Sequence, residues 1–423
     1  MRREVIPVFT FLFLALFWIT GCSSYQQGLM QSQRSQYPAA IEHFKEALQS
    51  DPSHLEARRQ LGYAYLKNGQ RAEAIGQFRQ VLDQEPDDPF CTYYLGMSYL
   101  EDGRHGKTVE TWRAYRNPKQ PIFESELSRQ TTVVEIYDSI QLAHQAIDQE
   151  KLLKTQPPQP NVIAVFSYLD TSPDSRFKHL ERAMATLIIT DLSQVKSIKV
   201  VERLKIQCLL MEAKLGESGI VQPGTAPHAA RLLGAENLIT GTLGPGSMQA
   251  KTSLASTSKR AVVSAFSVST EPDKFYTLEK EIVYHVVNLL KVPLTAEENS
   301  KINAYHTKNL IAVTYFGQGL EAMDTGKWDE ARRFFTQAVV EDPGFELARR
   351  YRDSCPSSST ASLSALGTMS NAELTGFVES NMEEALSADS PLATTSAGVG
   401  SGDTGTSTGE APGPSTGGVS VSW

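Results

Sequence analysis

The first third of the chain repeats one pattern of small and large residues at an interval of 34 residues. Three glycines keep this spacing, and so do three aromatic residues that each follow their glycine by 16 positions: Gly28, Gly62, Gly96, Phe44, Phe78 and Trp112. A glycine lets two helices approach closely, and a proline such as Pro52 or Pro86 ends the second helix before the next unit. The pattern predicts helix pairs that stack into a curved array, which is a binding scaffold rather than a catalyst.

The middle unit resembles the tetratricopeptide repeat, which has a period of 34 residues. The family positions are filled by Leu61, Gly62, Tyr65, Ala74, Phe78 and Pro86. This resemblance implies three repeats over residues 22–121. A final unit is expected within the helical segment 276–355, where the same spacings are kept by Gly319, Ala331, Phe335, Ala338 and Pro343.

The N-terminus has the pattern of an export signal. Arg2 and Arg3 precede an apolar run from Val5 to Trp18, and Cys22 follows directly after small or branched residues. The run is shorter than the ~20 residues that a membrane span needs. The pattern resembles the bacterial lipoprotein signal, which implies a signal peptide over residues 1–21 and a lipid on Cys22. Ser23 stands where an inner-membrane retention signal has aspartate, which favours the periplasmic face of the outer membrane.

The remainder of the chain divides by composition and periodicity. Apolar residues spaced near 3.6 predict a long helix over residues 122–156 that caps the array. Pro157–Pro160 is expected to be a stiff linker that separates two cores. Strands alternate with helices over residues 157–275, which predicts an α/β sandwich with some parallel pairing and then an antiparallel hairpin. From residue 356 a Ser/Thr/Gly-rich tail is expected to be disordered, apart from a short helix over Asn371–Leu386.

Three segments of the α/β region carry a second resemblance: Val200–Arg203, Glu212–Gly219 and Leu233–Gly241. Together they resemble the periplasmic domain of the CsgG family of curli secretion, and the N-terminal domain of the TolB translocation protein shares its general plan. The resemblance implies a role in assembly or export at the cell envelope. The curli channel builds its pore from hairpins with ~9 to 11 lipid-facing residues per strand. Residues 243–275 alternate small polar residues instead, so a pore is not expected.

The residue patterns give no support for catalysis. The eight histidines show no metal-ligand spacing, so neither a metal nor a cofactor is expected. Gly241–Gly246 is glycine-rich, but it lacks the lysine of a phosphate-binding loop. A formal net charge of −8 argues against nucleic acid as a partner. Glu202 with Arg203 is either an exposed interaction pair or a local surface feature. Cys91, Cys208 and Cys355 lie far apart, which favours buried thiols over a structural pair.

In tetratricopeptide arrays the first helix of each repeat lines the concave groove. The resemblance carries that role onto ten positions: Glu56, Arg59, Tyr63, Leu66, Lys67, Phe90, Tyr93, Met97, Leu100 and Glu101. Six of them are expected to bind a partner: Arg59, Tyr63, Lys67, Phe90, Tyr93 and Met97. Phe90, Tyr93 and Met97 form an apolar stripe that suits an extended or helical peptide. Alternatively, the long helix after Ile122 covers this stripe.

The sequence therefore predicts a non-enzymatic lipoprotein scaffold, with a CsgG-like α/β domain flanked by tetratricopeptide helices and followed by a disordered tail. The expected partners are proteins or peptides, bound for envelope assembly or export, and the outer membrane, reached through the lipid on Cys22. The rival hypothesis is a subunit of a secretion channel that forms a homo-oligomer through the CsgG-like domain.

Overall fold

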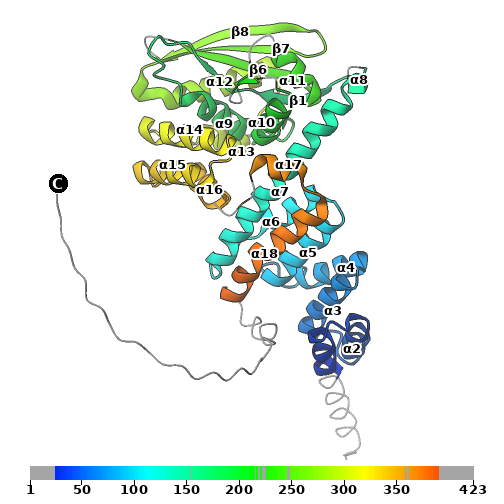
Figure 1. Ribbon diagram of the computed structural model, residues 1–423. Coiled ribbons are helices and arrows are strands. Elements are labelled where there is room, and N and C mark those ends of the chain that lie inside the picture. The colour runs from blue at the N-terminus through cyan, green and yellow to red at the C-terminus, as the bar shows by residue number, and fades with distance from the viewer. Residues whose placement is uncertain are drawn as a thin grey trace, which may run out of the picture.

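A computed structural model describes residues 24–153, 155–214, 216–217, 220–221, 225–244, 248–357, 360 and 362–389. The predicted signal peptide and Cys22 lie outside these residues. The helical array lies at one end of the molecule and the sheet at the other, with a long helix between them (Figure 1). Across the described residues, helices that combine the length and the apolarity needed to span a membrane are absent.

The array consists of helix pairs in which a glycine of the first helix contacts a ring of the second. Residues 24–33 are helical, and the following helices are α2 (Tyr37–Ser50), α3 (Leu55–Lys67), α4 (Arg71–Leu82), α5 (Pro89–Glu101) and α6 (His105–Ala114). A Cβ added at Gly96 would lie 1.9 Å from Nε1 of Trp112, and one at Gly62 would lie 2.7 Å from the Phe78 ring. The 34-residue period therefore reflects the close contact between a glycine and a ring that recurs in each helix pair.

Helix α7 (Pro121–Asp148) follows the array and is continued by the short α8 (Glu150–Leu153). It packs against α6 on one side and against helices of the sheet domain on the other. The predicted long helix is thus confirmed, but the predicted separation of two cores is wrong. A continuous cluster of buried apolar side chains runs from Ala40 in the array through Val134 in α7 to Ile163 in the sheet.

The sheet has the strand order β3-β1-β6-β7-β8, with β2 paired to one end of β6. Strand β1 pairs in parallel with β3 and β6, and β6, β7 and β8 are antiparallel, as predicted. The bounds are β1 (Gln159–Val165), β2 (Leu169–Asp170), β3 (Lys199–Val200), β6 (Ala235–Gly244), β7 (Met248–Ser256) and β8 (Ala261–Thr270). The sequence did not predict β2 or the small hairpin of β4 (Gly216–Glu217) and β5 (Ile220–Val221). Because β1 begins at Gln159, the second half of the predicted linker is part of the sheet.

Helices cover both faces of the parallel part of the sheet. One face packs on α9 (Leu180–Leu192) and α12 (Phe275–Leu289). The other face packs on α10 (Arg203–Glu212) and α11 (Ala226–Leu232). The short 3-10 helix η1 (Pro272–Lys274) precedes α12. Neighbouring residues of β6 show the alternation, because Ile239 joins the first core and Leu238 the second. Gly241 is required on β6, since a Cβ there would lie 2.1 Å from the ring of Tyr168.

The C-terminal third returns to helices. α13 (Ala296–Asn303) begins with the predicted capping box of Thr295 and Glu298, and α14 (Leu310–Asp324), α15 (Trp328–Glu341) and α16 (Glu346–Ser354) form the predicted repeat with its cap. Two helices follow, α17 (Leu363–Thr368) and α18 (Asn371–Asp389). The short helix predicted from Asn371 is therefore present, but the disordered tail was predicted to begin too early. Residues 390–423 lie outside the described residues.

Candidate functional site

The array holds the last described helix of the chain. Helix α18 packs along α7 and α5 and reaches α3 through Lys67 (Figure 1). We call the surface of α3, α5 and α7 that it contacts the groove. Four apolar residues of α18 recur at intervals of four, four and three and are at most 5% exposed: Leu374, Val378, Met382 and Ala385. Such spacing places one apolar face of an amphipathic helix against the array.

Polar contacts fix α18 at its first turn and near its middle. Asn371 donates from Nδ2 to the carbonyl of Leu100 at 2.9 Å, and its Oδ1 lies 2.8 Å from Nε2 of His105. Lys67 Nζ donates to Glu379 at 2.5 Å. Burial would lower the pKa of Lys67, but the hydrogen bond and charge of Glu379, together with the nearby Tyr63 and Tyr37, raise it. A carboxylate on the bound helix is therefore matched to this lysine.

The segment before α18 is held by α7. Tyr137 donates from its hydroxyl to the carbonyl of Met369 at 3.3 Å, and Gln141 donates to the carbonyl of Gly367 at the same distance. A Cβ on Gly367 would lie 3.2 Å from Cγ2 of Ile140, so α17 also approaches α7 closely. The long helix thus serves as the platform from which α18 extends into the groove.

The predicted residues Tyr63, Phe90 and Lys67 lie together at the groove. The Tyr63 ring lies 6.0 Å from Phe90 and 5.0 Å from Tyr94, centroid to centroid, and Lys67 Nζ lies 5.7 Å from the Tyr63 centroid. All four side chains are half-buried. Burial raises the pKa of Tyr63, so its hydroxyl remains a neutral donor at neutral pH. A half-buried aromatic patch beside a cation suits a peptide with apolar and acidic side chains.

The structure contradicts the prediction that Tyr93 and Met97 face an incoming partner, because they are only 1% and 2% exposed. The Tyr93 ring stacks on Trp112 with centroids 6.0 Å apart, and Trp112 Nε1 donates to the Tyr93 carbonyl at 3.2 Å. Tyr93 thus belongs to the contact between α5 and α6. Tyr93 and Met97 are part of the core, and only Phe90 of the predicted stripe stays half-buried.

Arg59 joins two repeats. It donates to Glu56 at 2.8 Å and Asp88 at 2.6 Å, and it also contacts Glu85. Burial alone would lower the pKa of Arg59, but these carboxylates, Asp88 foremost, raise it. Asp88 also accepts the backbone N–H of Cys91 and so caps α5. Since Arg59 is already satisfied, its contribution to partner binding would require it to release these carboxylates.

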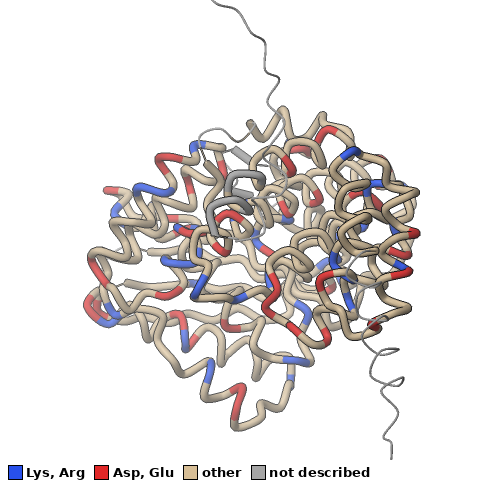
Figure 2. Tube along the Cα trace, turned by 90° about the horizontal axis from the view of Figure 1, so that it is seen from below, with Lys and Arg blue, Asp and Glu red and all other residues tan. Residues whose placement is uncertain are grey.

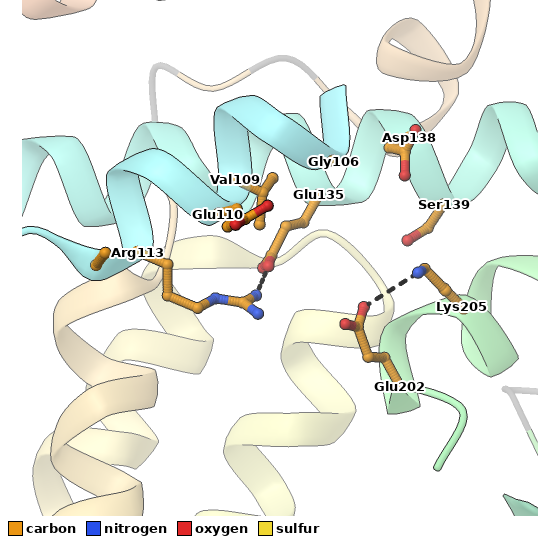
Figure 3. A pocket seen from close by; sticks show the side chains of 10 residues that line it. Gly106, Val109, Glu110, Arg113, Glu135, Asp138, Ser139, Glu202 and Lys205 are labelled. Carbon is orange, nitrogen blue, oxygen red and sulfur yellow. Dashed lines mark ion pairs between the residues drawn. The ribbon is translucent and has the colours of Figure 1, made fainter. Parts of the chain in front are cut away.

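A cleft of about 430 Å³ lies between α6, α7 and the start of α10 (Figure 3). Its walls carry two ion pairs, Arg113 with Glu135 and Lys205 with Glu202 at 3.5 Å. Lys and Arg residues are also interspersed with Asp and Glu residues over the part of the chain that the structure describes (Figure 2). The lining of this cleft thus carries charges of both signs rather than the concentrated positive charge that nucleic acid requires.

Glu202 and Arg203 do not form an exposed pair. Arg203 turns inward and donates to Asp324 at 2.5 Å, while Arg182 donates to the other oxygen of that carboxylate at 3.0 Å. Asp324 is buried. Burial of Arg203 would lower its pKa, but the charge and hydrogen bond of Asp324, together with Tyr351, raise it. This cluster ties α14 of the C-terminal repeat to α9 and α10 of the sheet domain, which the sequence did not reveal.

A second buried cluster was also missed, because its members lie far apart in the sequence. Asp191, Glu279 and His306 could together ligate a metal ion, but Lys280 already supplies a cation. Lys280 Nζ lies 2.5 Å from Asp191 and 3.2 Å from Glu279. Burial, with the neighbouring Asp191 charge, raises the pKa of Glu279 well above its usual value. This arrangement is a neutralised structural network.

Cys91, Cys208 and Cys355 are buried free thiols, which confirms the prediction against a structural pair. Burial raises the pKa of Cys208 to about 12 and that of Cys355 to about 11. Such thiols are protonated at neutral pH, so they are poor nucleophiles and poor metal ligands.

Two family models match the chain. Residues 32–90 match the tetratricopeptide repeat, and residues 145–273 match the family described as "Curli production assembly/transport component CsgG". The chain therefore contains a tetratricopeptide array and a CsgG-family domain, in agreement with both resemblances in the sequence. The second match begins within α7, so the end of the long helix belongs to the CsgG-family match, whereas the tetratricopeptide match ends before α7 begins.

No curated protein matches the chain. Among solved structures, a tetratricopeptide repeat protein from Parabacteroides merdae ATCC 43184 has 11% identity and a TM-score of 0.26, with 79% of this chain and 98% of that chain covered. Yeast Tom70 has 12% identity and a TM-score of 0.24, with 86% and 69% covered. Scores this low establish no shared overall fold, so function has to be argued from the groove itself.

Proposed function

We propose that this protein is a non-enzymatic scaffold, anchored by a lipid on Cys22 to the periplasmic face of the outer membrane, that binds protein partners in its groove during envelope assembly or export. The two matched families are scaffold and transport types rather than catalysts. The observation that carries the proposal is the half-buried patch of Tyr63, Lys67 and Phe90, which lies on the face of the array that already receives a helix.

Photo-crosslinking in the native membrane tests this role. A benzoylphenylalanine replacing Phe90 keeps a phenyl ring at this position and extends it by a benzoyl group, whose reactive ketone lies at the groove. The matched control carries it at Gly76 of α4, where an added Cβ meets nothing within 4 Å. We expect discrete protein adducts from position 90 and none from position 76. Equal adducts from both positions, or none from position 90, would contradict binding at the groove.

The anchor has its own test. Replacing Cys22 with serine is expected to leave the precursor unprocessed or the protein outside the membrane fraction, because a lipid chain contributes ~0.8 kcal/mol per buried CH₂. Normal processing and unchanged membrane association would disprove lipidation at this residue.

A channel subunit is the second candidate, and the edge of the sheet favours it. Strand β8 pairs only with β7 among the described residues, and its ten residues include neither a charge nor a proline. Val262 and Val263 are 61% and 53% exposed. Long uncharged edges readily accept another strand. A closed ring in detergent that Val263→Lys breaks into single copies would support the channel, whereas a monomer in both cases supports the scaffold.

A further inference from the structure

We infer that α18 is the chain's own stand-in for a partner's amphipathic helix, and that α18 and the partner compete for the same groove. The inference rests on the proposed function, because it names the chemistry of the ligand and the way in which the site is controlled. The expected ligand has apolar residues at positions i, i+4, i+8 and i+11, with a carboxylate directed at Lys67.

The division of α18 into two faces supports this ligand chemistry. Leu374, Val378 and Met382 are completely buried, while Ala372, Glu373 and Ser380 remain exposed. Helix-in-groove recognition uses anchors with this helical spacing. The geometry of the bound α18 thus describes the shape and polarity that the groove accepts.

The polar contact that holds the middle of α18 can be broken and re-formed. The side chains of Lys67 and Glu379 are 27% and 38% exposed, so their ion pair contributes little to the stability of the docked helix. Gly376 lies within the helix with open space around it, and glycine stabilises a helix less than alanine does. The helix therefore owes its order to the groove, and a better helix of the same pattern can replace it.

The array does not need α18 to complete its repeats. The two helices of each pair pack through their own glycine and ring. Helix α18 lies far away in the sequence, since Glu379 is 312 residues from its partner Lys67. Because α18 is tethered, its effective concentration at the groove is of millimolar order. A free helix must overcome this advantage, so occupancy by α18 sets a threshold for partner binding.

The test uses the full chain and a fluorescent synthetic peptide of residues 369–389. Leu374→Asp with Val378→Asp removes the apolar anchors of α18, and Ser380→Asp on its exposed face is the matched control. Fluorescence anisotropy should show the peptide binding the double variant at least about tenfold more tightly than the wild type or the control. Circular dichroism checks that the variants remain folded.

A charge exchange keeps the test informative if the double variant is poorly folded. Lys67→Glu places a negative charge opposite Glu379, so it should weaken both α18 and the native peptide. A peptide carrying Glu379→Lys should bind this variant at least about threefold more tightly than the native peptide. Equal binding by the wild type and the double variant, or no recovery by the exchanged charges, would overturn the inference. Groove adducts in membranes without peptide binding would leave the proposed function standing and refute only the helical ligand.

Discussion

At the scale of single residues, one atom decides whether two helices can pack. The glycine of each repeat contacts a ring because a hydrogen, rather than a methyl group, faces it. Gly96 has the least room, since an added Cβ would lie 1.9 Å from Trp112 Nε1, and that ring is itself held by its hydrogen bond to Tyr93. Gly76 offers the opposite environment, with nothing within 4 Å.

Gly96→Ala should therefore lower the free energy of unfolding by about 1–3 kcal/mol or more, as overpacked cores do. Gly76→Ala should raise it by about 0.5–1 kcal/mol, because alanine restricts the unfolded chain and favours a helix. Urea titration followed by circular dichroism measures both. Similar effects from the two substitutions would show that the contact with Trp112 does not limit the packing.

Glu279, in the buried network with Asp191 and Lys280, makes the stability of the fold depend on pH. Its pKa is raised in the folded protein by burial and by Asp191, so the folded state keeps this proton to higher pH than the unfolded state. Stability from this group is thus present below the usual value of 4.5 and is lost as the pH rises toward the raised pKa. The pKa of Asp191 is lowered from 3.8, so the contribution of this group to stability changes only below pH 3.8, outside the range from pH 5 to pH 8.

Glu279→Gln cannot ionise, so its stability relative to the wild type should increase between pH 5 and pH 8. Exposed Glu281→Gln is the control and should show no such trend. Unfolding midpoints at the two pH values decide the matter, and parallel changes in both variants would refute a raised pKa at Glu279.

At the scale of elements, the repeat was predictable and its partners were not. The glycine and the ring of a repeat lie 16 residues apart and contact each other directly, so their spacing is visible in the sequence. Tyr93 and Tyr94 are neighbours on one helix turn, and only tertiary packing decides that Tyr93 is core. The docking of α18 depends on a contact across 312 residues, for which the sequence offers no local signal.

The junction of α9, α10 and α14 rests on Asp324, which lies between Arg182 and Arg203. Asp324→Ala would remove the carboxylate that both guanidinium groups contact, and breaking a buried ion pair in this way costs about 3–5 kcal/mol. Exposed Glu341→Ala is the control and should change stability little. Thermal unfolding of both variants gives the comparison. A loss below about 1 kcal/mol for Asp324→Ala would mean that the junction does not depend on this carboxylate.

At the scale of the whole molecule, α7 joins a tetratricopeptide array to a CsgG-family domain within one continuous core. Both parts were predictable from motifs. Their shared core was not, because the proline-rich sequence before β1 suggested a stiff linker that separates two cores. A shared core gives the groove a fixed position relative to the sheet. The array can therefore present a bound partner to the CsgG-family domain in a defined orientation.

The central claim is that α18 and a partner's helix occupy the same groove. Cysteines replacing Lys67 and Glu379, bridged by a short bis-maleimide, would lock α18 in place while the three native thiols remain buried. Anisotropy with the peptide of residues 369–389 then compares the bridged protein with the same protein left unbridged. The account predicts that bridging lowers peptide affinity at least about tenfold. Equal affinity in the two forms would contradict it.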